Sequence, residues 1–424
     1  MPVQKNRLLA ILGPGILVAA TGVGAGDLAT GAFTGNKLGM AVLWVVIVGA
    51  ALKFVLNEGL ARWQLATGHT LLEGAVMHLG RPVQWIFAIY LCIWSFLVGL
   101  ALMSACGVTF HAMVSPSCDA ETDKILYGIL HSALAVGLVR WGGYRLFERV
   151  MSACIAIMFI VVVVTAVALK PPLNEIVAGL FIPSIPNIGG EGLDWTIALL
   201  GGVGGTVTVL CYGYWIREKG RQGVEELKLC RIDLATAYLM TALFGLSMVV
   251  VGSQIGNVKG GGSGLIVQLA NELESALAPL GTQAKWAFLV GAWGAVFSSL
   301  LGVWQSLPYL FTDFWYLMQD PQNTTGRRTI DTQSKPYKGY LLTIASVPAV
   351  GLWWLDFETA QKMYAIVGAL FIPMLALVLL ILNGQTRLVG QQFRNSRFNS
   401  ALLIATLAIF LVAGWFGIQN KFFG

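Results

Sequence analysis

Apolar runs long enough to cross a lipid bilayer recur along the whole chain, and they restrict its possible folds more than any other feature. A helix needs about 20 consecutive apolar residues to cross a ~30 Å hydrocarbon core. With 56% hydrophobic and only 11% charged residues among 424, the composition excludes a soluble enzyme. The runs predict an all-α integral membrane protein with eleven transmembrane helices, at residues 8–35, 39–62, 83–113, 124–140, 148–169, 194–216, 232–255, 285–313, 339–355, 361–382 and 399–419.

Basic residues between these runs predict the orientation of the chain. Most of the 27 lysines and arginines fall in loops that are cytoplasmic if the N-terminus lies inside the cell, as the positive-inside rule requires. An odd number of spans then places the C-terminus on the other side. The start of the chain runs into the first span without the small-residue cleavage site of a signal peptide. We therefore predict a multi-pass protein of the plasma or inner membrane, with a cytoplasmic N-terminus and an extracellular or periplasmic C-terminus.

The first apolar run is interrupted near its middle by small residues and an acid. The interrupting residues are Gly22, Gly24, Gly26, Asp27 and Thr30. Each glycine costs a helix roughly 1 kcal/mol relative to alanine, and a carboxylate at the bilayer centre costs at least ~2.5 kcal/mol. Such an interruption indicates a discontinuous helix with a transport site near the membrane midplane. Close helix packing through Gly22 and Gly26 is the alternative, but it does not explain Asp27.

A second glycine-rich interruption, Gly201–Thr206, lies in the sixth span. The first and sixth spans are five apart and run in opposite directions, which is the pattern of an inverted repeat. We predict a first five-helix repeat at residues 1–170, an extracellular connector at 171–193, a second five-helix repeat at 194–382 and an additional eleventh helix at 383–424. If the sixth helix unwinds, its free carbonyls can coordinate a cation or bind a substrate.

Polar residues beside these two breaks are the candidate substrate-binding or ion-binding residues. We predict that the set comprises Gly24, Gly26, Asp27, Thr30, Gly204, Thr206, Thr208, Cys211 and Tyr212. The alternative for the hydroxyl groups is a hydrogen bond to their own helix. A second set lies in the second span: Lys53 near its middle, with Asn57 and Glu58 about one turn later. We predict that Lys53 pairs with Asp27 or Glu58, either for coupling or charge compensation or as a structural ion pair.

Short motifs spread over most of the chain resemble the Nramp family of divalent-metal transporters, and they occur in the family's order. They are Gly13-Pro14-Gly15, Ala29-Thr30, Leu43-Trp44-Val45-Val46, Leu60-Ala61-Arg62, Ala66-Thr67-Gly68, Gly143-Tyr144-Arg145 with Glu148, Gly205-Thr206-Val207 and Arg231-Ile232-Asp233. The resemblance implies a LeuT-like fold, with two inverted five-helix repeats, an additional C-terminal span, and helices 1 and 6 unwound at the site.

The residues at the expected metal site depart from the family pattern. The family's Asp-Pro-Gly-Asn motif falls on Gly24-Ala25-Gly26-Asp27, and its Met-Pro-His motif falls on Thr208-Val209-Leu210. The soft thioether ligand, which would favour manganese and iron, is therefore absent, and so is the histidine implicated in proton handling. Asp27 is the one ionic metal ligand that the resemblance leaves, three residues from the family's position.

From these observations we predict a secondary active transporter, and not an enzyme. We expect it to work by alternating access around helices 1 and 6. We predict that its substrate is a small ion, most simply a divalent metal cation: either a hard one such as Mg²⁺, or Mn²⁺ or Fe²⁺ with altered selectivity. The alternative is an ion-coupled carrier of a small organic solute or anion, bound at the helix N-termini. A membrane scaffold or sensor without turnover is a third interpretation. We predict no cofactor, no nucleic-acid partner and lipid as the surroundings; a monomer is consistent with the sequence.

Overall fold

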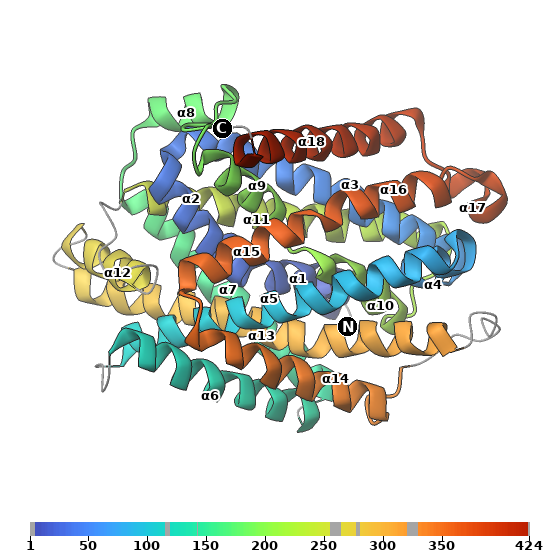
Figure 1. Ribbon diagram of the computed structural model, residues 1–424, viewed down its shortest axis with the longest axis horizontal. Coiled ribbons are helices and arrows are strands. Elements are labelled where there is room, and N and C mark those ends of the chain that lie inside the picture. The colour runs from blue at the N-terminus through green and yellow to red at the C-terminus, as the bar shows by residue number, and fades with distance from the viewer. Residues whose placement is uncertain are drawn as a thin grey trace.

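The fold is described from a computed structural model, in residues 5–114, 119–141, 143–254, 264–276, 280–319 and 330–422. Within these ranges the chain forms helices and connecting turns, without a β-strand. Most of the long helices run alongside one another, along the longest axis of the molecule (Figure 1). This is the all-α architecture that the apolar runs predict.

Each predicted span falls on one or more of the observed helices. The helices of the first half are α1 (Lys5–Gly22), the π-helix η1 (Val23–Ala29), α2 (Thr30–Leu38), the 3-10 helix η2 (Gly39–Val42), α3 (Leu43–Thr67), α4 (Leu71–Leu79), α5 (Arg81–Met113), α6 (Ala120–Trp141), α7 (Gly143–Ala168) and α8 (Leu173–Phe181). Those of the second half are α9 (Gly192–Gly202), η3 (Val207–Leu210), α10 (Cys211–Glu218), α11 (Glu225–Ser253), α12 (Gly264–Ala276), α13 (Gly281–Gln319), α14 (Lys335–Ser346), η4 (Val347–Trp353), α15 (Phe357–Ala369), α16 (Phe371–Leu382), α17 (Thr386–Phe393) and α18 (Arg397–Phe422).

Length and apolarity alone give a smaller number of spans than the sequence predicts. In the described part of the chain, 8 helical segments are long and apolar enough to cross a membrane, or up to 9 if α7 and the sharply bent α8 form one span. One of these segments, Asp27–Thr67, has 41 residues, and a straight helix of that length would measure about 60 Å. The chain turns inside this segment at Gly39, whose φ angle is +68°. The segment therefore includes the end of the first predicted span and the whole of the second. The predicted total of eleven is therefore not established by this criterion.

The interruption of the first span differs from the predicted unwinding. Between α1 and α2 the chain stays coiled, but it widens into the seven-residue π-helix η1, which contains Gly24, Gly26 and Asp27. A π-helix bonds residue i to i+5, so it shifts the partners of the backbone groups at both of its ends, and such segments are frequent at functional sites. The first span is therefore interrupted at the expected position, but by a change from α-helix to π-helix and not by a stretch of extended chain.

The sixth span is broken as predicted. Helix α9 ends at Gly202, and a non-helical turn leads into η3 and α10. Gly204 and Gly205 have φ angles of +72° and +83°, a region that costs other L-residues roughly 1–2 kcal/mol. A Cβ atom added to Gly22 would lie 2.6 Å from the Gly205 nitrogen, so the two breaks contact each other backbone against backbone. The first and sixth spans thus pack closely through glycine at the same place where their helices are interrupted.

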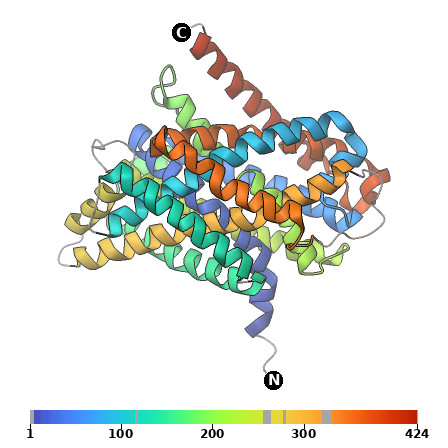
Figure 2. The same ribbon diagram turned by 60° about the horizontal axis from the view of Figure 1, so that its bottom comes forward.

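The short helices gather at the two ends of the bundle. Figure 1 shows α4 and α17 at one end and α8 and α12 at the opposite end. The predicted topology places the first pair in the cytoplasm and the second pair outside, so the arrangement agrees with it, although the orientation itself remains a prediction. The C-terminal helix α18 packs against α3 and α16 and extends beyond the body of the bundle (Figure 2).

A hydrogen-bonded cluster joins α4, α10 and α13 at the end of the bundle where α4 lies. Thr70 and Glu73 form a capping box at the start of α4. The Glu73 carboxylate also accepts a hydrogen bond from Arg217 of α10 at 3.0 Å. The hydroxyls of Thr70 and Tyr214 donate to Asp313 of α13, at 3.2 and 2.6 Å. These contacts hold the far end of the broken sixth span against its neighbours.

Acid is expected to weaken this cluster through Glu73, which lies outside the spans. Burial raises the pKa of Glu73, but hydrogen bonding with His69 and the charge of Arg217 outweigh it, so the folded-state pKa lies below the ordinary 4.5. The carboxylate therefore stabilises the fold above about pH 4.5, and this contribution disappears as the pH falls through the folded-state pKa. Thermal unfolding of the purified protein should show a Tm that falls at acidic pH, less steeply in Glu73→Gln. An equal acid slope in the two proteins would contradict this assignment.

Candidate functional site

Asp27 lies in the π-helical break of the first span, fully buried, opposite the break of the sixth. Its Oδ2 atom accepts a hydrogen bond from the Gly204 N–H at 3.1 Å. Its Oδ1 atom is buried and, among the described residues, has no hydrogen-bond partner. Buried polar atoms nearly always have a partner, and an exception in a native protein requires an explanation. The structure thus brings together two residues that the sequence selected from different spans.

A serine from a distant helix, Ser299, forms hydrogen bonds at the π-helical break. Ser299 of α13 accepts a hydrogen bond from the Gly24 N–H at 2.8 Å and donates one to the Ala20 carbonyl at 3.0 Å. It therefore satisfies two backbone groups at the helix break. A Cβ atom on Gly24 would lie 2.2 Å from the Ser299 Oγ, so glycine is needed for this approach. A serine in an apolar span gives no sequence signal for such a contact.

Lys53 contacts backbone carbonyls, where the sequence predicted an ion pair with Asp27 or Glu58. Its side chain is 2% exposed, and its Nζ atom lies 2.5 Å from the carbonyl oxygens of Gly201 and Val203. A third hydrogen bond goes to the Gly205 carbonyl. An ammonium group has three N–H donors, so these carbonyls use all of them. Among the described residues, no direct ion pair joins Lys53 to Asp27 or Glu58, because carbonyls at and just beyond the end of α9 lie within reach of the middle of α3. Asp27 is nevertheless close enough for its charge to interact with that of Lys53.

The two other residues predicted beside Lys53 have separate partners. Asn57 donates a hydrogen bond to the Tyr238 hydroxyl of α11. Glu58 forms ion pairs with Arg62 and Arg231, each at 2.8 Å. Glu58 therefore joins α3 to α11 and is not the counter-charge of Lys53. Its two arginines lie 4 and 173 positions away, and only the nearer could be found from helical spacing.

The remaining predicted residues fall into two groups. Thr30, Thr206 and Thr208 are buried around the two breaks. Tyr212 instead donates to the Asp233 carboxylate at 3.1 Å, and this carboxylate also accepts hydrogen bonds from Gly15 of α1. The Tyr212 hydroxyl therefore takes part in a contact among α1, α10 and α11, and its hydrogen bond goes to Asp233 and not to Asp27.

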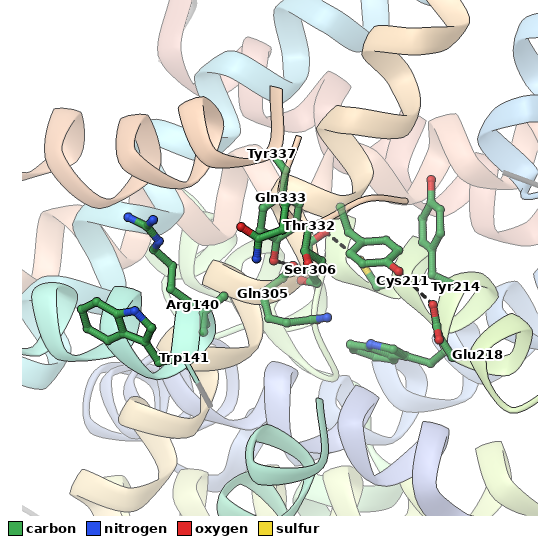
Figure 3. A pocket seen from close by; sticks show the side chains of 13 residues that line it. Arg140, Trp141, Cys211, Tyr214, Glu218, Gln305, Ser306, Thr332, Gln333 and Tyr337 are labelled. Atoms are coloured by element: carbon green, nitrogen blue, oxygen red, sulfur yellow. Dashed lines mark hydrogen bonds between the residues drawn. The ribbon is translucent and has the colours of Figure 1, made fainter. Parts of the chain in front are cut away.

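Cys211 lines a cavity that begins where the broken sixth span becomes helical again. The cavity has a volume of about 350 Å³, and side chains of α6, α10, α13 and α14 line it (Figure 3). Arg140 and Trp141 lie on one side and Tyr214 and Glu218 on the other (Figure 3). Neither Asp27 nor Lys53 lines this cavity. The cavity therefore lies beside the sixth span and is separate from the contact between the two breaks.

The breaks offer few side-chain ligands for a metal ion. Among the residues described, no three His, Cys, Asp or Glu side chains gather closely enough to hold one. The available donors are the Asp27 carboxylate, backbone carbonyls and buried hydroxyl groups. A cation bound here would be coordinated by oxygen, with water completing its shell.

Comparisons with known proteins agree with the resemblance found in the sequence. The divalent metal cation transporter MntH of Klebsiella pneumoniae is 24% identical over 250 residues, which are 57% of this chain and 57% of that protein. The alignment thus spans little more than half of that relative. MntH of Caldanaerobacter subterraneus is 22% identical over 308 residues, 70% of each chain.

Solved structures show the same fold. A mutant of the Eremococcus coleocola manganese transporter superposes with a TM-score of 0.73 at 17% identity, covering 99% of this chain and 88% of that one. MhsT in complex with L-phenylalanine superposes with a TM-score of 0.66 at 16% identity, covering 97% and 98%. A model of the family described as natural resistance-associated macrophage protein-like matches residues 15–419. The chain therefore belongs to the Nramp family and has the fold of its transporters.

Proposed function

We propose that this protein is a secondary active transporter that moves a hard divalent metal cation, such as Mg²⁺, by alternating access around its two broken helices. The observation that carries the proposal is the Oδ1 atom of Asp27, which is buried where the breaks meet and has no hydrogen-bond partner in the part of the chain that the structure describes. A carboxylate oxygen without a partner in an apolar interior is unfavourable by itself. A cation arriving from water would supply the missing partner.

The chemistry of the surrounding groups favours a hard cation. Mg²⁺ is bound by oxygen, commonly through one or two carboxylates, and it keeps several of its waters. Thr206 and Thr208 add hydroxyl groups, and Thr208 stands where the family pattern has its methionine. The relatives named as divalent metal or manganese transporters support a metal substrate in general. Transport of Mn²⁺ with reduced preference over Mg²⁺ is consistent with the same donors.

The proposal includes the arrangement that the sequence predicts. The inverted repeats at 1–170 and 194–382 would open the site alternately to either side, with the N-terminus in the cytoplasm and the C-terminus outside. No GxxxxGK[ST] motif for ATP occurs, so an ion gradient or the gradient of the substrate itself would drive transport.

The organic-solute alternative has less support at these breaks. A carboxylate substrate would need free N–H groups at a helix N-terminus or a free positive group. The Gly204 N–H at the sixth-span break already binds Asp27, and Lys53 is the lysine at this position. All three of its donors are used by the carbonyls of Gly201, Val203 and Gly205. The negatively charged group present at the breaks, Asp27, would repel an anion.

Flux measurements in proteoliposomes test the proposal. Saturable uptake of Mg²⁺ or Mn²⁺ by the wild-type protein is expected, with a loss of at least about 100-fold in Asp27→Asn, because the amide removes the charge that stabilises the cation. The matched control is Asp123→Asn: Asp123 is also fully buried but pairs with His111 at 2.8 Å, away from the breaks. It should retain flux. Absence of metal uptake by folded wild-type protein, or equal uptake by Asp27→Asn, would refute the proposal.

A further inference from the structure

The end of helix α9 and the turn that follows it present three backbone carbonyls to one point in space: Gly201 lies in α9, and Val203 and Gly205 lie just beyond it. The last carbonyls of any α-helix lack partners within the helix, and here the chain turns sharply at Gly204 and Gly205, so the oxygens of Gly201, Val203 and Gly205 converge. They also lie at the negative end of the helix dipole. This point lies away from the solvent-accessible surface, because Val203 and Lys53 are buried.

Converging carbonyls at the end of a half-helix are the ligands that a small cation uses in a membrane interior. Oxygen ligands of this kind suit hard cations, and Lys53 Nζ donates a hydrogen bond to each of the three oxygens. The ammonium group thus has the position and the contacts of a coordinated ion. It differs from a free ion in being attached to α3 by a four-carbon chain.

The same short segment also binds the anion of the site. Asp27 accepts a hydrogen bond from the Gly204 N–H, while Lys53 donates to the carbonyls of the residues on either side, Val203 and Gly205. Both charges are therefore held by three consecutive residues of the break. A cation that binds Asp27 enters the immediate surroundings of the ammonium group, and at such distances two positive charges repel strongly in a protein interior.

We propose that these three carbonyls form a cation site that the protein fills with its own Lys53, and that a transported cation competes with the ammonium group for it. The competition rests on the proposed transport function, whereas the cation site itself does not. Binding of the transported cation requires the Lys53 side chain to leave its carbonyls, so Lys53 lowers the affinity for the ion and helps its release.

Replacing Lys53 by methionine tests this assignment by removing the tethered charge and keeping most of the side chain's volume. Purified Lys53→Met is unfolded by heat in N-methyl-D-glucamine chloride, and then with equal concentrations of LiCl, NaCl, KCl, MgCl₂ or MnCl₂. We expect a Tm below that of the wild type in the organic cation, and a rise of at least about 5 °C with one or more of the small cations, because a free ion replaces the ammonium group. In the wild type, the Tm should change by less than about 1 °C with LiCl, NaCl or KCl, and with MgCl₂ or MnCl₂ it should rise by less than in Lys53→Met.

Lys124→Met is the matched control. Lys124 is also a buried lysine, but it pairs with Glu121 at 2.5 Å and with the single carbonyl of Leu355 at 3.1 Å. Its loss should lower the Tm without making it depend on the small cations. The double variant Asp27→Asn/Lys53→Met should lose most of the cation response, since the counter-charge is gone.

Titration of Mn²⁺ by calorimetry tests the competition. Lys53→Met should bind Mn²⁺ at least about tenfold more tightly than the wild type. If Lys53 only capped α9, its replacement would leave the affinity for Mn²⁺ unchanged or weaken it.

The proposed cation site is refuted if Lys53→Met folds without a cation-specific rise in Tm. It is also refuted if Lys53→Met fails to fold in every salt, since no free ion then replaces the ammonium group. A cation-dependent Lys53→Met together with a wild type that transports no metal would uphold the site and refute the transport proposal. The opposite result, metal flux that needs Asp27 with no cation response in Lys53→Met, would refute the site alone.

Discussion

Replacing Glu58 by glutamine is expected to lower the free energy of unfolding by about 3–5 kcal/mol, because it leaves a buried arginine without its counter-charge. Arg62 is 2% exposed and pairs with Glu58 at 2.8 Å; it also donates to the Phe393 carbonyl at 2.8 Å. Arg231, the second partner, is half exposed and can be hydrated. The main loss therefore comes from Arg62, and thermal unfolding of the purified variant measures it.

Two further variants separate this effect from a role in transport. Glu191→Gln removes an exposed ion pair with Lys362 and should cost less than about 1 kcal/mol. Glu58→Met/Arg62→Met removes both buried charges and should recover most of the stability lost in Glu58→Gln, with flux per folded protein close to the wild type. A Glu58→Gln protein of normal stability but altered pH dependence of transport would instead return Glu58 to the coupling role predicted from sequence.

Replacing Gly204 by alanine is expected to disrupt the binding site and reduce flux to background. The φ angle of +72° costs alanine roughly 1–2 kcal/mol, and the new Cβ would lie 2.7 Å from Cε1 of the Tyr238 ring. Overpacking of this kind typically costs a further ~1–3 kcal/mol. Relief of the clash moves the Gly204 N–H, which holds Asp27, so activity should fall more than stability. Uptake and Tm are measured on the same preparation.

Gly68→Ala is the control for backbone strain alone. Gly68 has a φ angle of +74°, but a Cβ atom there meets nothing within 4 Å. It should lose roughly 1–2 kcal/mol of stability and keep its flux. Equal effects of the two alanines on transport would show that the contact with Tyr238 and the position of Asp27 are unimportant.

Much of the fold could be predicted because a bilayer imposes simple requirements on sequence. About twenty apolar residues are needed per span, and all predicted spans coincide with helices. The positions of the two helix breaks could also be predicted, because runs of glycine weaken a helix. The form of the first break could not be predicted, because the π-helix at residues 23–29 has a tertiary contact: its Gly24 N–H donates to Ser299, 275 residues away in the chain.

The candidate site was only half predictable for the same reason. Asp27 and Gly204 could be found from sequence, because a carboxylate and a run of glycines are costly in a membrane helix. The partners of Lys53 could not, since backbone carbonyls carry no residue identity and become available only where the chain turns at Gly204 and Gly205. Tyr212 was selected for its nearness in sequence, but the helix turns it toward Asp233.

The sequence by itself determined that the chain lies in a membrane, where its helices are and where two of them break, because apolar length and helix propensity are properties of consecutive residues. Only the tertiary structure decided which charge meets which partner. Lys53 was free to pair with Asp27 or Glu58 on sequence grounds, yet the three carbonyls at the end of α9 bind it. A buried charge forms hydrogen bonds with the groups that surround it. Which groups surround it depends on how helices far apart in the chain pack together.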